Sequence, residues 1–274
     1  MANPHCATHG LAAVAMGLFV ACHAGSPASP EPAANESGHQ VEVPKGSSHS
    51  TETASTEPIR EELAVEGAHP LLLWSPAGTK EQALIVSAHG AGCMPEDHCA
   101  YLWGLSRGQA IVACLPGEPL YRLHPERGFY FKDHRALAGE LEAAMRAIEV
   151  RFGTRLSEDR TYVGYSQGAT MGALLLPDSP LSFRQILLIE GGGEGMLRAS
   201  AQRLKAKGTE RVLFACGTSG CKGRAERVAS LLDNVGIDAR VVFGEGAGHT
   251  YLGAVETTVL EVTGWLWPSV ASAN

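Results

Sequence analysis

The sequence predicts an α/β fold in a single domain, with a mostly parallel central sheet and helices on both faces. Between about residue 58 and residue 268, short apolar runs alternate with segments whose apolar residues recur at helical spacing. This alternation is typical of parallel strands connected by helices. No second linker interrupts the pattern, and no segment is long enough for a large lid. We therefore expect one domain that spans residues 58–274.

The expected strands are short apolar runs, several of them continuous as in strands that are buried on both faces. They cover residues 60–67, 69–76, 83–90, 110–116, 161–166, 184–192, 211–217 and 239–249. The expected helices cover residues 99–108, 132–153, 167–176, 196–208, 224–236 and 255–268. In the helix over 132–153, Asp133 can cap the N-terminus and Gly153 follows the last turn.

The segment before the domain is typical of an exported protein. Residues 10–22, "GLAAVAMGLFVAC", form an apolar run that is too short for a mature membrane span and suits the core of a signal peptide. It resembles a bacterial lipoprotein signal, which would make Cys22 the lipidated first residue. Cleavage after Ala24 is the alternative, and an uncleaved N-terminus is a third. Residues 23–57 are rich in Pro, Ser, Glu and Ala, which predicts a disordered linker.

Composition narrows the classes of partner. The chain of 274 residues has 22 basic and 29 acidic residues, a net charge of −7, and no stripe of Lys or Arg. A nucleic-acid partner is not expected, because proteins that bind nucleic acids concentrate positive charge on one face. The remaining expectations are a small-molecule substrate and, through lipidation, a membrane. The sequence does not indicate an oligomeric state.

The candidate nucleophile is Ser166, in the segment "GYSQG" between an expected strand and an expected helix. This G-x-S-x-G pattern holds a serine on a sharp turn, so that its hydroxyl projects above the sheet. Side chains at Gly164 and Gly168 would collide with the neighbouring strand and helix. The amide of Gln167, at the start of the helix, would face the oxyanion that develops during acyl transfer.

A serine hydroxyl needs a base, and the sequence offers one after the last strand. His249, in "EGAGHTY", stands in the place where such a fold carries its catalytic histidine. The second oxyanion donor should come from the loop after the third strand, where "SAHGAGC" supplies the amide of Ala91. Gly90 and Gly92 would let the backbone of that loop approach the substrate.

The segments "HGAG", "GYSQGA" and "GHTY" together resemble the α/β-hydrolases, in particular their small carboxylesterase, phospholipase and acyl-thioesterase branch. The resemblance covers residues 58–268 and implies a serine mechanism without a metal or cofactor. It also implies an acid in a segment like "HGxxDxxVP", but residues 216–223 read "CGTSGCKG" and contain no carboxylate. Glu190, at the end of the strand after the nucleophile's strand, is the expected substitute. Glu194 and Glu245 are the alternatives.

Five cysteines follow Cys6 and Cys22, and in an exported protein they are expected to form disulfides. Cys216 and Cys221 flank the loop that lacks the acid, and a bridge there would make it rigid. Cys99 and Cys114 are the second expected pair, with Cys93–Cys99 as the competing assignment. No Cys/His spacing indicates a zinc site.

The sequence therefore predicts an exported serine hydrolase that cleaves a carboxylic ester or thioester, with Ser166 as nucleophile, His249 as general base and Glu190 as acid. Without a lid, its site should be open and suit small or accessible esters. Two alternatives use the same fold. One is a serine peptidase or other amide hydrolase on the same residues. The other is a surface binding protein without catalytic activity, which the missing acid motif would favour.

Overall fold

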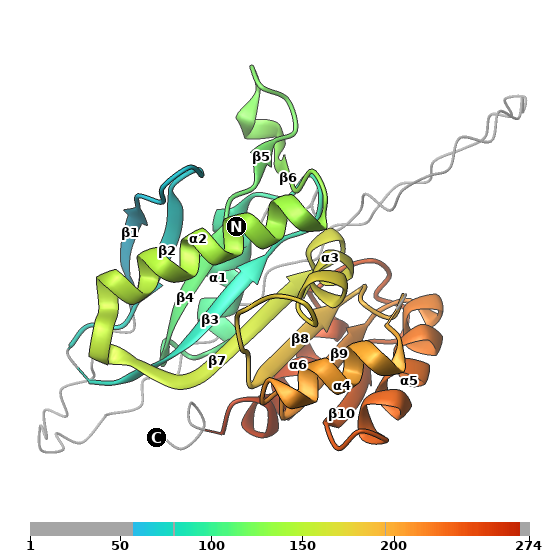
Figure 1. Cartoon of the computed structure of the whole chain (residues 1–274). Helices are drawn as coiled ribbons and strands as arrows, with labels where there is room; N and C mark the ends of the chain where they lie inside the picture. Colours follow the sequence, from blue (N-terminus) through green and yellow to red (C-terminus); the bar gives the residue numbers. More distant parts are fainter. Residues whose placement is uncertain (1–56, 79, 195, 269–274) are drawn as a thin grey trace, which may run out of the picture. The chain divides into compact units, whose positions relative to one another are not determined.

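The computed structural model describes residues 57–78, 80–194 and 196–268 (Figure 1). The predicted signal peptide over residues 1–22, the lipidation site at Cys22 and all but the last residue of the predicted linker lie outside the described residues. In the part that is described, no helix combines the length and the apolar character that a membrane span requires.

Eight strands form the central sheet, in the order β1-β2-β4-β3-β7-β8-β9-β10. β2 is antiparallel to β1 and to β4, and the six strands from β4 to β10 are parallel. The bounds are β1 (Ile59–Leu63), β2 (Leu71–Ser75), β3 (Gln82–Ala88), β4 (Ala110–Leu115), β7 (Leu156–Tyr165), β8 (Gln185–Ile189), β9 (Arg211–Cys216) and β10 (Asp238–Phe243). This arrangement confirms the predicted mostly parallel sheet.

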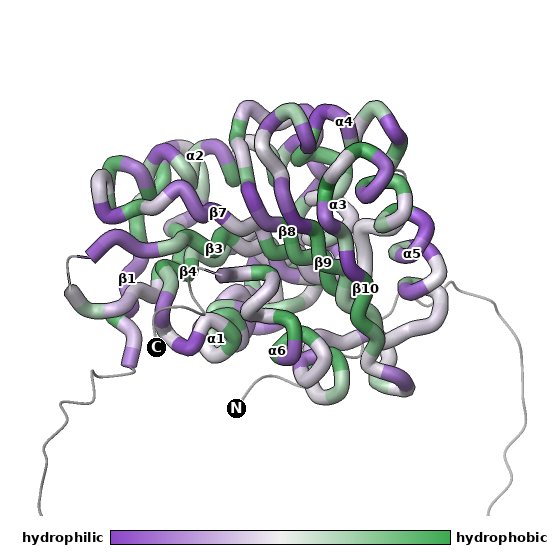
Figure 2. Tube along the Cα trace, turned by 90° about the horizontal axis from the view of Figure 1, so that it is seen from below, coloured by the Kyte–Doolittle hydropathy of each residue, from purple (hydrophilic) through white to green (hydrophobic). Residues whose placement is uncertain are grey.

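Helices cover both faces of the sheet (Figure 2). The bounds are α1 (Pro95–Leu105), α2 (His134–Phe152), α3 (Gln167–Leu175), α4 (Arg198–Ala206), α5 (Ser219–Asp233) and α6 (Ala254–Leu266), with 3-10 turns η2 (Pro125–Arg127) and η3 (Gly153–Arg155). Helices α1 and α6 pack on one face, and α2, α3, α4 and α5 on the other. Each face has its own apolar core, because every residue of the central strands β4 and β8 is buried.

Helix α2 illustrates how closely local signals set an element. Asp133 accepts hydrogen bonds from the amides of Arg135 and Ala136, both at 2.9 Å, which satisfies two of the four amides that a helix N-terminus leaves unpaired. The helix ends at Phe152, and Gly153 follows with a positive φ of 53°. The buried side of α2 consists of apolar residues at helical spacing: Leu137, Leu141, Ala144, Met145, Ile148 and Phe152.

A hairpin that the sequence pattern did not predict stands at one end of the sheet, β5 (Glu118–Pro119) paired antiparallel with β6 (Phe129–Tyr130) (Figure 1). Strands of two residues carry no periodicity, so residues 116–131 read as a loop. Residues 120–127 between the two strands are all exposed, and Leu123 is 89% exposed. Phe131, after the second arm, is buried in the core. Among the described residues, no inserted segment forms a large lid.

Candidate active site

Ser166 lies on a sharp turn between β7 and α3. Its backbone has φ 50° and ψ −106°, in the left-handed region that non-glycine residues rarely adopt. A side chain at Gly168 would collide with the carbonyl of Ala88, and one at Gly164 would lie 2.6 Å from the amide nitrogen of Ala169. The two glycines therefore let strand, turn and helix pack together as the sequence predicts. Strain of this kind persists only where the surroundings impose it.

His249 faces this serine from the loop between β10 and α6. Its Nε2 lies 2.7 Å from Oγ of Ser166, and its side chain is partly exposed. The two residues are 83 positions apart in the chain, and the parallel sheet brings them together because both follow the carboxyl end of a strand.

Glu190 completes the chain of contacts. Its Oε2 lies 3.0 Å from Nδ1 of His249, and it follows β8 directly. Three non-glycine residues among those described have positive φ, and two of them are Ser166 and Glu190, the latter at 51°. The alternatives from the sequence lie elsewhere: Glu194 forms an ion pair with Arg224, and Glu245 is exposed and has no contact with His249 among the described hydrogen bonds.

The carboxylate of Glu190 is buried and surrounded by hydrogen-bond donors. The amides of Gly217 and Thr218 donate to Oε1, the latter at 2.9 Å, and the Thr218 hydroxyl donates to Oε2 at 3.1 Å. Burial acts to raise the pKa of Glu190, but these bonds and the His249 ring outweigh it and hold the pKa below the usual value. Glu190 is therefore ionised at neutral pH and accepts a hydrogen bond from Nδ1–H of His249. That tautomer leaves Nε2 free to accept the Ser166 proton.

The loop "CGTSGC" contains no carboxylate of its own, but its residues hold the carboxylate of Glu190. Thr218 also caps helix α5, since its hydroxyl oxygen accepts a hydrogen bond from the amide of Cys221 at 3.3 Å. The Glu190 carboxylate thus lies at a helix N-terminus, where the dipole favours negative charge. Gly217 connects Glu190 to the loop of His249. Its amide donates to Glu190, and its carbonyl accepts from the amide of Gly248 at 3.2 Å.

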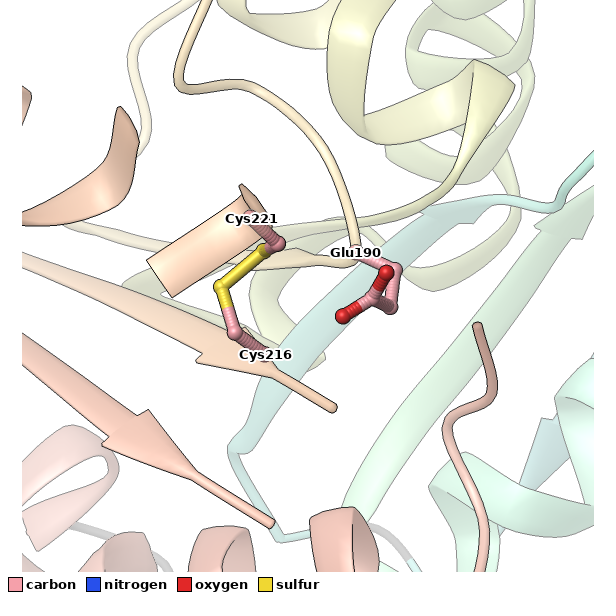
Figure 3. Close-up of side chains that lie close together, drawn as sticks. All are labelled: Glu190, Cys216 and Cys221. Atoms are coloured by element: carbon pink, nitrogen blue, oxygen red, sulfur yellow. A yellow bond between two sulfur atoms is a disulfide. The ribbon is translucent and has the colours of Figure 1, made fainter. Parts of the chain in front are cut away.

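Cys216 and Cys221 form the predicted disulfide, which closes this loop beside Glu190 (Figure 3). Atoms of Glu190 and the two cysteines that could ligate a metal lie within 4.8 Å of one another. Both sulfurs are bonded to each other, however, so neither offers the thiolate that binds zinc. The disulfide instead closes the loop that surrounds Glu190.

Cys99 and Cys114 form the second predicted disulfide, between α1 and β4. Cys99 therefore does not pair with Cys93, and the competing Cys93–Cys99 assignment is wrong. The two partners come together because α1 returns the chain to the β4 side of the sheet, with both residues fully buried.

The predicted oxyanion donors lie beside Ser166, Ala91 on the loop after β3 and Gln167 at the first residue of α3. Within the described residues, the amides of Ala91 and Gln167 donate to no protein acceptor, whereas the neighbouring amides of Gly92 and Gly168 donate to Phe129 and His89 at 2.7 and 3.1 Å. Ala91 is exposed and Gln167 partly so. Two unpaired amides beside a nucleophile are what an oxyanion requires.

Sequence reasoning missed a contact between the hairpin and the nucleophile turn. The side-chain Oε1 of Gln167 accepts a hydrogen bond from the amide of Phe131 at 2.8 Å, just after the hairpin. The same hairpin arm, β6, also pairs with the loop of Ala91, where the amide of Phe129 donates to the carbonyl of Cys93 at 2.9 Å. The loop of Ala91 and the first residue of α3, Gln167, are thus both attached to the hairpin. No sequence pattern signals bonds between residues so far apart.

The fold is that of the α/β-hydrolases, and comparison with solved structures shows it. The chain resembles TT1662 from Thermus thermophilus (20% identity, TM-score 0.58), over 79% of this chain and 99% of that one. It also resembles an esterase from the archaeon Pyrobaculum calidifontis (16%, 0.54), over 79% and 86% of the two chains. A dienelactone hydrolase from Anabaena variabilis (16%, 0.56) matches over 76% and 97%. No protein-family model and no curated protein matches the chain. Identities this low show the fold alone.

Proposed function

We propose that the chain is an exported serine hydrolase that cleaves carboxylic esters or thioesters through an acyl-enzyme on Ser166. The observation that carries the proposal is the continuous contact from Ser166 Oγ to His249 Nε2 at 2.7 Å, and from His249 Nδ1 to Glu190 at 3.0 Å. A nucleophile within hydrogen-bond reach of a base, with the base oriented by a third group, is the arrangement that activates a serine.

The reaction follows from these contacts. Ser166 Oγ attacks the ester carbonyl while His249 takes its proton, and the amides of Ala91 and Gln167 bind the oxyanion of the tetrahedral intermediate. His249 then returns the proton to the leaving alcohol or thiol as the carbon–oxygen or carbon–sulfur bond breaks. Water, deprotonated by His249, releases the acid and regenerates Ser166. Glu190 stays ionised throughout and stabilises the imidazolium.

Two disulfides support the proposed export. The Cys99–Cys114 and Cys216–Cys221 bonds lie within the folded domain. Disulfides of this kind persist in oxidising compartments and are rare in the cytosol. The proposal of a lipid anchor at Cys22 rests on the sequence signal alone.

The test compares the wild-type chain with Ser166→Ala on short- and long-chain aryl esters, a thioester and an aryl amide. Ser230→Ala, an exposed serine on α5, is the matched control. We expect ester hydrolysis that falls at least about 10³-fold in Ser166→Ala and does not change in Ser230→Ala. A fluorophosphonate probe should label wild type and Ser230→Ala only. Turnover of the amide alone would replace the ester proposal by a peptidase, and no turnover with no labelling would favour a binding protein.

A further inference from the structure

Tyr165, the residue before the nucleophile, occupies a place that the proposed mechanism does not use. It ends β7 and is 1% exposed, on the face of the sheet that α1 and α6 cover. A residue that only filled this core could be any large apolar side chain. Three contacts of Tyr165 are more specific than that.

The first contact joins Tyr165 to the base. Its hydroxyl donates a hydrogen bond of 3.0 Å to the main-chain carbonyl of His249, and the two rings lie 5.6 Å apart between centroids. The ring of Tyr251, two residues after His249, packs edge-on against Tyr165 at 4.9 Å. Burial raises the pKa of Tyr165, so the hydroxyl keeps its proton and remains a donor. The hydroxyl of Tyr165 therefore holds the main chain of the loop that carries His249.

A further contact joins Tyr165 to the oxyanion loop. The Tyr165 ring lies directly under Gly90, where an added Cβ would be 2.9 Å from two ring carbons and 3.2 Å from Cβ of Ser166. The ring therefore fills the space below this loop and fixes how near the following residue, Ala91, stands to Ser166. Gly90 is required here because the ring leaves no room for a side chain.

We propose that Tyr165 is a positioning residue, which aligns His249 and the loop of Ala91 on the adjacent Ser166 without touching the substrate. The proposal rests on the serine hydrolase function proposed above. One rigid side chain is bonded covalently to the nucleophile's residue, by a hydrogen bond to the base's main chain, and by packing to the oxyanion loop. Small displacements of groups that react have large effects on rate, so such a bridge matters most in the transition state.

The decisive variant is Tyr165→Phe, which keeps the ring and removes the bond to His249. We expect kcat for a short aryl ester to fall about 10-fold with KM unchanged, because the substrate still binds to the same open site. Tyr101→Phe is the matched control. Tyr101 belongs to the same cluster, with its ring 4.7 Å from that of Tyr251, but its buried hydroxyl has no partner among the described residues. Tyr101→Phe should leave both constants as in wild type.

Tyr165→Leu tests the contact with the oxyanion loop, because it removes the ring as well. We expect a further fall in kcat of several-fold below Tyr165→Phe. Melting temperatures of all variants separate folding from alignment. Wild-type kcat in Tyr165→Phe, whatever its melting temperature, would overturn the bond to His249, and equal kcat in the two variants would overturn the role of the ring. A wild-type chain without ester turnover would overturn the proposed function itself.

Discussion

The turn that carries Ser166 and the region that holds Glu190 are built in different ways. The turn is one segment of five residues, Gly164 to Gly168, whose two glycines leave room for the backbone of Ala169 on the adjoining helix and of Ala88 at the end of β3. Glu190 is held by amides and a hydroxyl from a loop 27 residues further along the chain, which a disulfide closes. Steric constraints inside a short segment restrict the residue types there, whereas hydrogen bonds between distant segments leave little trace in either segment.

The largest expected effect comes from a substitution of Glu190. Glu190→Gln removes the charge that selects the Nδ1–H tautomer of His249, and we expect kcat to fall roughly 10³-fold with little change in KM. Steady-state kinetics on an aryl ester measures it. Glu194→Gln and Glu245→Gln are matched controls from nearby loops, and each should stay within about 2-fold of wild type. A Glu245→Gln loss as large as that of Glu190→Gln would contradict our assignment.

The next prediction concerns a substitution in the turn that carries Ser166. Gly168→Ala places a methyl group against the carbonyl of Ala88, in backbone that cannot yield. We expect the free energy of unfolding to fall by about 3 kcal/mol, as overpacking does elsewhere. Gly139→Ala is the control, because a Cβ at Gly139 on α2 meets nothing within 4 Å. That variant should gain about 0.5–1 kcal/mol in urea unfolding. Equal stability of the two would mean that the turn tolerates a side chain.

This contrast explains what could be predicted from the sequence. Ser166, with its glycines, was visible because the turn and the flanking strand and helix are local. Glu190 could be proposed from its place at the end of a strand, but only the 3.0 Å contact with His249 distinguishes it from Glu194 and Glu245. Thr218 could not be found, because its bond to Glu190 depends on how β8 and β9 align. The hairpin was missed for a related reason: its two-residue strands have no pattern of their own, and contacts with the distant residues Gln167 and Cys93 hold the β6 arm.

The two disulfides sharpen the comparison because only one of them supports the site. Replacing Cys216 and Cys221 by serine should lower the free energy of unfolding by about 2 kcal/mol and kcat several-fold, since the loop that holds Glu190 is released. Replacing Cys99 and Cys114, which close a longer loop, should remove about 3 kcal/mol and leave kcat unchanged. Urea unfolding and ester kinetics below the melting range measure both. The reverse pattern in kcat would show that the loop around Thr218 needs no closure.

The smallest expected effect comes from a comparison of Glu190, which is buried, with Glu140, which is partly buried. Glu140 has one amide donor, Gly117 at 2.9 Å, and burial raises the pKa of Glu140 to about 7, whereas Glu190 with several donors has a lowered pKa. Because the folded pKa of Glu140 lies above the unfolded value, its stabilising contribution is complete below about pH 4.5 and is lost as pH rises through 7. We expect a loss of about 2 kcal/mol between pH 5 and 8 from this group.

Glu140→Gln should abolish that part of the pH dependence, which urea unfolding at pH 5 and pH 8 would measure. Glu142→Gln, two residues along the same helix, is the matched control and should keep the wild-type slope. A wild-type slope in Glu140→Gln would show that Glu140 is ionised throughout this range.

The hairpin has a practical consequence, since its β6 arm is attached to the candidate site and its tip is exposed. Residues 120–127 are exposed throughout, so the chain can be cut or lengthened there while the β6 arm keeps its bonds to Gln167 and to the loop of Ala91. An affinity tag inserted after Leu123 would therefore stand in solvent. The protein therefore offers a built-in attachment point through which it could be fixed to a surface without replacing any residue of the candidate active site.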